Sequence, residues 1–412
     1  MTSSPTVILL LVSFLDTMSV ALILPHLDIQ AKGLGFNHIQ IGLVGAVFSG
    51  SQLISSPIVG SLSDVIGRKS ILIFCITICS LSYLSLGVTS SIIMFLCIRG
   101  ILGAFKQTQL LTRALAPDHI DDPDKVAVLY GRLISLGSLG IAVGPVISGH
   151  LMEAYPNNGF TIVCAIISAI FMFNAGLIHS LPEILHEKKE QPSEVAPIGP
   201  KLFDSVADTL KQSINKFYIV DWANCWDIFL FKLLMSLTVG LYYSNFGLLL
   251  TTQHGLSPVY LGYIIGFQGI IGSISNNSIG FVNKFYVNDK DYSQRIFHIF
   301  VVTTLSLIGL AIVPDVYFYI ALLIPKTITF ALARIVNLEL VRSRSEAGNR
   351  GTLIGALNSV RSVAGILTPI IGGFINQYLG VSYAFFAGAF FASIGIVISY
   401  RVRPRSIKEK VK

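Results

Sequence analysis

Residues 60–70 read GSLSDVIGRKS and separate two long apolar runs of the chain, 39–61 and 70–89. Each run has about 20 residues, the length that an α-helix needs to cross the roughly 30 Å of hydrocarbon in a bilayer. The stretch between them carries three charged residues and two glycines. We therefore predict two membrane-spanning helices joined by a short polar connection, a pattern that recurs along the whole chain.

The composition of the chain is typical of a membrane protein. Of its 412 residues, 53% are hydrophobic and 12% are charged, whereas soluble proteins carry about 25% charged residues. We predict an all-α membrane protein with twelve transmembrane helices, and the first of them is too long to be the core of a signal peptide. The predicted helices cover 5–27, 39–61, 70–89, 91–112, 126–152, 160–181, 225–251, 258–282, 294–313, 315–341, 350–375 and 381–402.

The positively charged residues set the predicted orientation. Connections after even-numbered helices and the C-terminal tail contain nearly all the Lys and Arg outside the apolar runs, whereas odd-numbered connections contain Lys32 and little else. Because cytoplasmic loops carry this excess, we expect both termini to be cytoplasmic, in the plasma membrane or an organelle membrane. The asymmetry accounts for the net charge of +7 without a nucleic-acid partner. The expected partner is the lipid bilayer, and the tail could contact its anionic headgroups.

The chain divides into four predicted parts. They are a six-helix half at 1–181, a cytoplasmic linker with a surface helix at 182–221, a second six-helix half at 222–402, and a basic cytoplasmic tail at 403–412. The halves resemble each other, because YGRLISLGSLGIAVGPVISG at 130–149 aligns without a gap with IGALNSVRSVAGILTPIIGG at 354–373. Two pseudo-symmetric halves predict alternating access, with a substrate site near the membrane midplane between them.

The connection at 60–70 has charges and glycines at a specific spacing. A carboxylate near a helix N-terminus is stabilised by about 0.3–1 kcal/mol, and glycines let two helix ends approach closely. The pattern resembles a signature of the major facilitator superfamily at this connection, formed here by Gly60, Leu62, Asp64, Gly67, Arg68 and Lys69. The alternative is a solvated turn whose cations only signal topology.

This resemblance implies a gate at the cytoplasmic face. In the family, the acidic residue of the signature faces the start of helix 11 and a basic residue at the end of helix 4. In this chain the resemblance implies that Asp64 faces the helix beginning near Gly351 and Thr352, with Arg113 as the basic partner. Val65 stands where the family usually has a basic residue. We therefore expect a gate that lacks one ionic contact and opens more easily.

The fifth predicted helix carries small residues at every fourth position, followed by a proline. The run resembles the antiporter motif of drug:proton exchangers in the same superfamily, with Ser148 where glycine is usual; its members are Gly140, Gly144, Pro145 and Gly149. Small residues permit close helix packing, and the proline interrupts the hydrogen-bond ladder. Packing alone is the alternative explanation of the glycines.

Three further stretches narrow the resemblance. FLDTMSVALILPHL at 14–27 resembles the first helix of tetracycline-type efflux proteins. Residues 105–115 and 226–246 resemble an animal branch called major facilitator superfamily domain-containing protein 9. The superfamily resemblance covers nearly the whole chain and implies secondary active transport, but it leaves the substrate open.

Ionisable side chains inside the predicted helices mark the candidate site, because charges inside a membrane are costly and mostly functional. Those expected near the midplane are Asp16, Arg99, Lys232, Lys326 and Arg361, while Lys106 and Arg334 are expected closer to the cytoplasm. Arg99, Lys106 and Arg113 are spaced by seven and are expected on one face of helix 4. Arg99 also matches the arginine of a helix-4 motif that the family associates with proton coupling.

The midplane bases outnumber the midplane acids, since Asp16 faces four of them. Such a cavity favours an anionic substrate, unless a buried lysine is neutral. Neutral hydrogen bonds to the substrate are expected from Tyr242, Tyr243, Asn245 and Gln268. In the alternative interpretation, pairs such as Asp16–Arg99 are structural braces, Lys232 or Lys326 extends toward the membrane surface, and the neutral residues are ordinary packing.

The sequence predicts a secondary active transporter with Asp16 as the proton site. Protonation of Asp16 would release its basic partner to an anion, and deprotonation would expel the substrate. We expect proton-coupled antiport of an organic anion or drug-like molecule by a monomer. An uncoupled uniporter and a non-transporting sensor or chaperone are the alternatives. The sequence contains no motif of an enzyme, a metal site or a cofactor site, and its five cysteines form no Cys-x-x-Cys pair.

Overall fold

The structure is a computed structural model, and it describes residues 5–120, 122–182, 222–287, 289, 292–344 and 350–409. The predicted linker lies outside the described residues from position 183 onward, as does the end of the predicted tail. The side chains of Gly351 and Thr352, where the predicted gate partner begins, lie outside them too.

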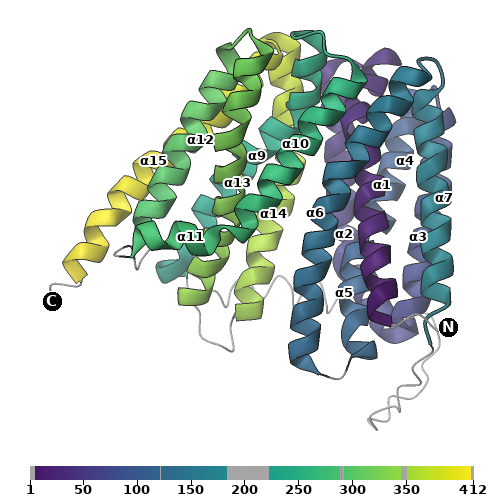
Figure 1. Cartoon of the computed structure of the whole chain (residues 1–412), viewed down its shortest axis with the longest axis horizontal. Helices are drawn as coiled ribbons and strands as arrows, with labels where there is room; N and C mark the ends of the chain where they lie inside the picture. Colours follow the sequence, from purple (N-terminus) through teal and green to yellow (C-terminus); the bar gives the residue numbers. More distant parts are fainter. Residues whose placement is uncertain are drawn as a thin grey trace.

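Every secondary-structure element in the described part of the chain is a helix, which confirms the predicted all-α membrane fold (Figure 1). The first half contains α1 (Pro5–Gly33), α2 (His38–Ile66), α3 (Arg68–Val88), α4 (Ile92–Phe105), α5 (Thr108–His119), α6 (Pro123–Ala154) and α7 (Gly159–His179). The second half contains α9 (Trp222–Thr252), α10 (Pro258–Asn277), α11 (Ile279–Asn283), η1 (Lys284–Tyr286), α12 (Ser293–Ile312), α13 (Val316–Arg344), α14 (Arg350–Tyr378) and α15 (Val381–Glu409). Within the described ranges, 11 helices are long and apolar enough to cross a membrane.

The fourth predicted helix is interrupted. Instead of one helix over 91–112, the chain forms α4 and α5, which are separated by Lys106 and Gln107. Polar side chains of α2 bind the unwound segment: Gln52 donates to the Lys106 carbonyl oxygen at 3.2 Å, and Gln107 donates to the Ser55 hydroxyl at 3.0 Å. Non-helical backbone at membrane depth needs such protein partners. The residues of α2 therefore make the break possible.

The break corrects the predicted stripe of charges on helix 4. A spacing of seven residues defines one face only within an unbroken helix, whereas Arg99 lies on α4, Lys106 lies in the break and Arg113 lies on α5. Arg99 and Lys106 are buried, and Arg113 is exposed. The three side chains therefore do not line one surface.

Each half of the molecule has its own hydrophobic core. Buried side chains of α1 to α7 form one cluster, and those of α9 to α15 form a second. Figure 1 shows the two halves side by side, with the start of α1 and the end of α15 at the lower end of the bundle. We call this the terminal end, and we call the opposite end the distal end.

The two halves meet at the distal end and separate toward the terminal end (Figure 1). Helix α2 approaches α14 so closely that a Cβ on Gly42 would collide with the carbonyl oxygen of Pro369. Helix α6 approaches α10 in the same way, where a Cβ on Gly262 would collide with the carbonyl oxygen of Pro145. Glycine allows such backbone contacts because it has no side chain. Near the terminal end of α2, by contrast, a Cβ on Gly60 would meet no described atom within 4 Å.

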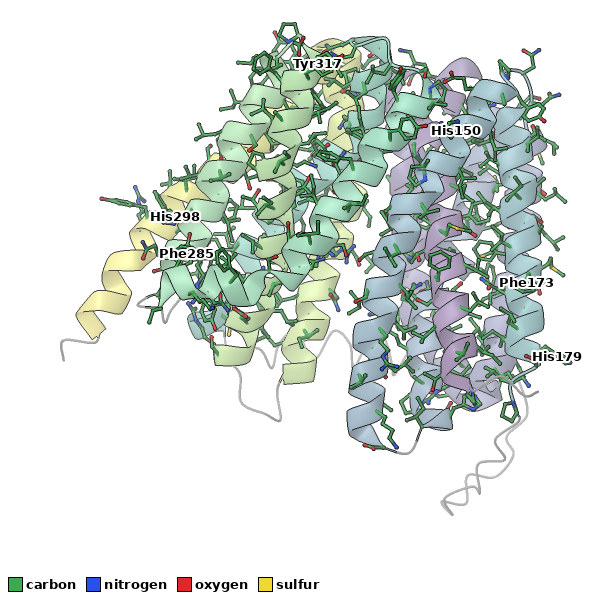
Figure 2. All side chains as sticks on the ribbon, viewed as in Figure 1. His150, Phe173, His179, Phe285, His298 and Tyr317 are labelled. Atoms are coloured by element: carbon green, nitrogen blue, oxygen red, sulfur yellow. The ribbon has the colours of Figure 1, made fainter. Side chains whose placement is uncertain are left out.

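Polar contacts add to the closed distal end. His150 of α6, labelled in Figure 2, has its Nε2 2.9 Å from the hydroxyl of Tyr263 on α10. Ser257, just before α10, donates to the Glu153 carboxylate of α6 at 2.7 Å. The structure is therefore closed at the distal end and open at the terminal end.

Candidate functional site

The first half holds a buried ion pair beside the break in its fourth crossing. The carboxylate of Asp16, on α1, is 1% exposed, and its Oδ1 lies 2.5 Å from Lys106 Nζ. Gln109, in the first turn of α5, donates to the other carboxylate oxygen at 3.1 Å. The ring of Phe171 lies 5.2 Å from the same ammonium group. Unwinding at Lys106 thus delivers one charged and one neutral donor to a single carboxylate.

The basic partner of Asp16, which the prediction did not name, is Lys106; the Asp16–Arg99 brace of the alternative interpretation does not form. The guanidinium of Arg99 lies over the Phe48 ring at 4.3 Å, and its Nε is 3.5 Å from the Val44 carbonyl oxygen. These contacts come from α2, so Arg99 connects α4 to α2 and leaves Asp16 to the residues of the break.

A second acid of α1, Asp28, interacts electrostatically with Arg99. The prediction missed Asp28 because the first predicted helix, 5–27, ended one residue before it, whereas α1 continues to Gly33. The signal available in the sequence was the lack of a helix-ending residue between Asp28 and that glycine, a common helix stop. The first half therefore balances its two embedded bases with two embedded acids.

The second half buries Lys326 of α13 completely. Its Nζ donates to Gln268 Oε1 at 2.5 Å and lies 3.7 Å from the centre of the Tyr242 ring. Tyr242 donates its hydroxyl to the same oxygen at 3.0 Å. The rings of Tyr243 and Phe330 lie 5.4 Å and 5.2 Å from the ammonium group. Lys326 thus points inward, which contradicts the alternative in which it extends toward the membrane surface.

Three other basic residues of the second half interact with one another, and we call them the cationic triad: Lys232 of α9, Arg334 of α13 and Arg361 of α14. The charge of Lys232 interacts with both arginines, and the two arginines interact with each other. Arg334 and Arg361 are exposed, and Lys232 is partly exposed. Tyr243, which is 53% exposed, lies within electrostatic range of Arg334. The structure therefore brings together three of the predicted substrate-binding residues.

Asn245 is separate from the Lys326 group. It donates to the Leu241 carbonyl oxygen at 2.6 Å and accepts a hydrogen bond from Asn376 at 2.5 Å. Its side-chain amide also packs on Gly372. The described contacts of Asn245 therefore connect α9 to α14 within the second half.

The predicted gate residues at 60–70 form an ion-pair chain within the first half. Arg68, at the start of α3, binds the Asp64 carboxylate at 2.9 Å and the Asp118 carboxylate at 2.6 Å. It also donates to the Ala114 carbonyl oxygen at 2.9 Å. Gly67 has φ +116°, a conformation that other residues rarely adopt. Arg68 therefore ties the connection between α2 and α3 to α5.

The expected pairing of Asp64 with Arg113 does not occur, because Asp64 binds Arg68. Arg113 contributes its backbone carbonyl, which accepts a hydrogen bond from Tyr130 at 3.0 Å. Lys69 donates to the carbonyl oxygen of Leu181 at 2.6 Å. These contacts lie within the first half, as expected where the terminal end is open.

Replacing Arg68 by alanine is expected to lower the free energy of unfolding by about 1 kcal/mol, because its ion pairs are partly solvated and therefore weak. Replacing Arg113 by alanine is the matched control and is expected to leave stability within about 0.5 kcal/mol of the wild type. Thermal unfolding of the purified proteins in detergent measures both. Equal effects of the two substitutions would contradict the assigned role of Arg68.

The small residues of α6 fit two neighbouring helices. A Cβ on Gly140 or Gly144 would press on the backbone of α1 at Met18, and a Cβ on Gly149 would press on the Pro258 carbonyl of α10. Ser148, the departure from the family pattern, lies 3.0 Å from the buried His26 Nε2 of α1. The motif therefore packs α6 against α1 of its own half and against α10 of the second half.

The second half also contains a charge network that the sequence did not reveal. Arg295 of α12 binds the Asp289 carboxylate at 3.1 Å and approaches the Glu339 carboxylate of α13 at 3.7 Å. Arg344, at the end of α13, binds Asp227 of α9 at 2.7 Å. Arg295 and Glu339, like Arg344 and Asp227, are far apart in sequence, so only the folded chain identifies these two pairs.

Among the described residues, no three His, Cys, Asp or Glu side chains are grouped so that they could hold a metal ion. The five cysteines are free, and four of them are buried. The groups that distinguish this molecule are therefore its embedded ion pairs and the cationic triad.

Comparison with known proteins agrees with this architecture. The quinolone resistance protein NorA of Staphylococcus aureus (strain MRSA252) is 24% identical over 374 residues, which cover 87% of each chain. Multidrug resistance protein 1 of Bacillus subtilis (strain 168) is 24% identical over 398 residues, which cover 95% of this chain and 94% of that protein. The crystal structure of a bacterial homolog of the human lysosomal transporter Spinster, inward-facing and unoccupied, has a TM-score of 0.75 at 13% identity, covering 96% of this chain and 94% of that one.

The family model described as Major Facilitator Superfamily matches residues 7–367, which is most of the chain. The matched region includes both six-helix halves up to the middle of α14. The chain belongs to the Major Facilitator Superfamily, and it is a multi-pass membrane transporter of small molecules and not an enzyme.

Proposed function

We propose that this transporter is a proton-coupled antiporter that moves an organic anion or drug-like molecule by alternating access. Support for a drug-like substrate comes from relatives named for resistance to quinolones and to multiple drugs. Both termini are cytoplasmic in this proposal, so the open terminal end of the structure faces the cytoplasm. The resemblance of 105–115 and 226–246 to the domain-containing protein 9 branch remains a prediction about its subfamily.

The observation that carries the proposal is the buried pair of Asp16 and Lys106. Both side chains are at most 6% exposed, and their charges lie 2.5 Å apart. A proton on Asp16 would remove its negative charge and leave Lys106 unneutralised, so that a substrate anion would be attracted to the site. Loss of the proton would restore the ion pair and weaken anion binding. Arg99, the other predicted coupling residue, supports this step by engaging Asp28.

The two ends of the bundle supply the alternating access that antiport requires. The distal end closes through α2–α14 and α6–α10, and the terminal end is open. Closing the terminal end would bring the connection with Asp64 and Arg68 toward the second half. Because Val65 is uncharged and 70% exposed, that closure would lack one ionic contact and reopen readily.

The proposal is tested by replacing Asp16 with asparagine in proteoliposomes. Norfloxacin, a quinolone, and carboxyfluorescein, an organic anion, serve as the probes. We expect the wild type to move at least one probe in response to a pH gradient, since Asp16 exchanges a proton in each cycle. The variant is expected to lose the pH-driven component while exchange of labelled for unlabelled probe persists, because asparagine does not titrate.

Asp315→Asn is the matched control, because Asp315 lies at the distal end, far along α13 from the site. Its carboxylate caps the start of α13 by accepting a hydrogen bond from the Tyr317 backbone. Asparagine is an equally good helix cap, so pH-driven transport should be unchanged. Unaltered pH-driven uptake in Asp16→Asn would contradict the assigned proton site. Transport indifferent to the pH gradient in the wild type would indicate a uniporter, and a lack of flux of either probe would favour a sensor or chaperone.

A further inference from the structure

The cationic triad lies at one depth in the bundle. Lys232 is ten residues from the start of α9, Arg334 is ten residues from the end of α13, and Arg361 is eleven residues from the start of α14. All three helix ends are at the terminal end, and a helix rises 1.5 Å per residue, so each basic residue lies about 15–17 Å from that end. Three helices thus bring one cation each to the same level.

The triad borders the space between the halves. Arg361 precedes Gly365 by four residues, and residues four apart share a helix face. Gly365 faces Ser49 of α2, where a Cβ would lie 3.4 Å from the serine hydroxyl. The face of α14 that carries Arg361 is therefore turned to the first half, below the level at which the halves touch. The exposure of Arg334 and Arg361 agrees with this placement.

The triad has no counter-charge in the described part of the chain. The described acidic side chains of the long helices interact elsewhere: Asp16 with Lys106, Asp28 with Arg99, Asp64 with Arg68, Glu153 with Ser257, Asp227 with Arg344 and Glu339 with Arg295. No hydrogen bond or ion pair among the described residues involves the side chains of the triad. The first half contributes the neutral pair of Asp16 and Lys106, so the described charges of the triad sum to about three positive charges at this level of the bundle.

We propose that the cationic triad binds a small organic dianion, with either two carboxylates or one phosphate ester group. The inference rests on the proposed function, since it names the substrate class of that transporter. Alternating access requires a state closed at both ends, in which water no longer solvates the triad. A monoanion would leave two charges uncompensated in that state, and uncompensated charges are costly when they are desolvated. A dianion would leave only one positive charge of the triad uncompensated.

The side chains of the triad suit such a ligand. A guanidinium group binds a carboxylate or phosphate through two parallel hydrogen bonds, and the triad supplies two of these groups together with the compact ammonium of Lys232. The exposed ring of Tyr243 lies 6.2 Å from that of Phe330 and borders Arg334. It offers an apolar surface with a hydroxyl for the organic part of the ligand. Lys326 lies on the buried side of the Tyr243 and Phe330 rings, which are 5.4 Å and 5.2 Å from its ammonium group.

The test measures thermal unfolding of the purified full-length protein in detergent, at constant ionic strength, with four probes. Succinate and butyrate have the same number of carbons but two and one carboxylates, phenyl phosphate supplies the phosphate ester, and tetraethylammonium is a cation. Ligands that bind the folded state stabilise it according to their dissociation constant. We expect succinate or phenyl phosphate to stabilise the protein at a concentration at least about tenfold lower than butyrate does. A tenfold difference corresponds to about 1.4 kcal/mol of binding free energy.

Arg361→Gln and Lys232→Gln are expected to abolish this preference, whereas Arg361→Lys, which keeps the charge, retains part of it. Lys284→Gln is the matched control, because Lys284 is an exposed cation of η1, outside the three helices that carry the triad, and it should leave the preference unchanged. If Arg361→Gln does not fold, Lys232→Gln and Arg361→Lys carry the comparison. An equal loss of preference in Lys284→Gln would overturn the proposal.

The remaining outcomes separate this inference from the proposed function. The dianion site is overturned if neither succinate nor phenyl phosphate is more potent than butyrate, if tetraethylammonium alone stabilises the protein, or if neither dianion has an effect, even if pH-driven transport is observed. Preference for a dianion that depends on the triad supports the site, even if transport of that dianion proves independent of a pH gradient. Transport of the dianion without pH dependence would contradict the proposed proton coupling but would still support the proposed substrate class.

Discussion

Replacing Lys106 by methionine is expected to lower the free energy of unfolding by about 3–5 kcal/mol, the usual cost of removing one partner of a buried ion pair. Asp16 would then remain buried as a carboxylate whose described side-chain hydrogen bond comes from Gln109. Methionine keeps most of the volume and the contact with Phe171. The decrease in the free energy of unfolding would therefore result from the missing positive charge and not from a cavity.

The double variant Asp16→Asn with Lys106→Met is expected to recover most of this stability, because no uncompensated charge remains. Thermal and denaturant unfolding in detergent measure the two single variants and the double variant, which together form a double-mutant cycle. Lys284→Met, at an exposed cation of η1, is the surface control. A double variant as unstable as Lys106→Met alone would show that the pair is not the reason for burying these charges.

Replacing Gly42 by alanine is expected to shift the protein away from the state seen here, because the new Cβ would collide with the backbone carbonyl of Pro369. A backbone group cannot rotate away as a flexible side chain can, and overpacking typically costs about 1–3 kcal/mol. That cost changes the equilibrium between two states by about 5–150-fold. The distal end would then open, and turnover would fall because the protein no longer returns to the state with an open terminal end.

Distances across the terminal end measure this shift directly. Spin labels at Val128 of α6 and Leu338 of α13, two exposed positions, report the separation of the halves in a background without the five native cysteines. We expect shorter distances in Gly42→Ala. Gly50→Ala is the control on the same helix, because its Cβ would lie 4.0 Å from the nearest side-chain atom, on Ile366. An unchanged distance distribution in Gly42→Ala would contradict the assigned role of this contact.

Hydropathy predicted most of the fold, because lipid imposes the same requirement on every spanning segment. Each must be about 20 apolar residues long and must satisfy its own backbone. Eleven of the twelve predicted spans correspond to continuous helices of sufficient length. The span at 91–112 does not, because helix continuity there depends on Gln52 and Ser55 of α2, which stabilise an unwound segment. Hydropathy along one segment carries no information about such neighbours.

The residues of the candidate site were also found from the sequence, since a charge within an apolar run is conspicuous. Their partners were not. Asp16 binds Lys106 and not Arg99, and Asp64 binds Arg68 and not Arg113. Each pairing depends on a distance of a few ångströms between helices that are separated in sequence. Asp28 was missed because hydropathy falls before it and the predicted helix ended there, whereas α1 continues as a helix to Gly33.

The sequence by itself therefore determined the all-α membrane fold, the two related halves and the embedded charges, because these depend on local composition and periodicity. Only the tertiary structure decided which charges neutralise one another, which end of the bundle is closed, and that Lys232, Arg334 and Arg361 lie at one level without a described counter-charge. The physical reason is that electrostatic energy depends on separation in space. Helix packing sets that separation, and the order of residues along the chain does not.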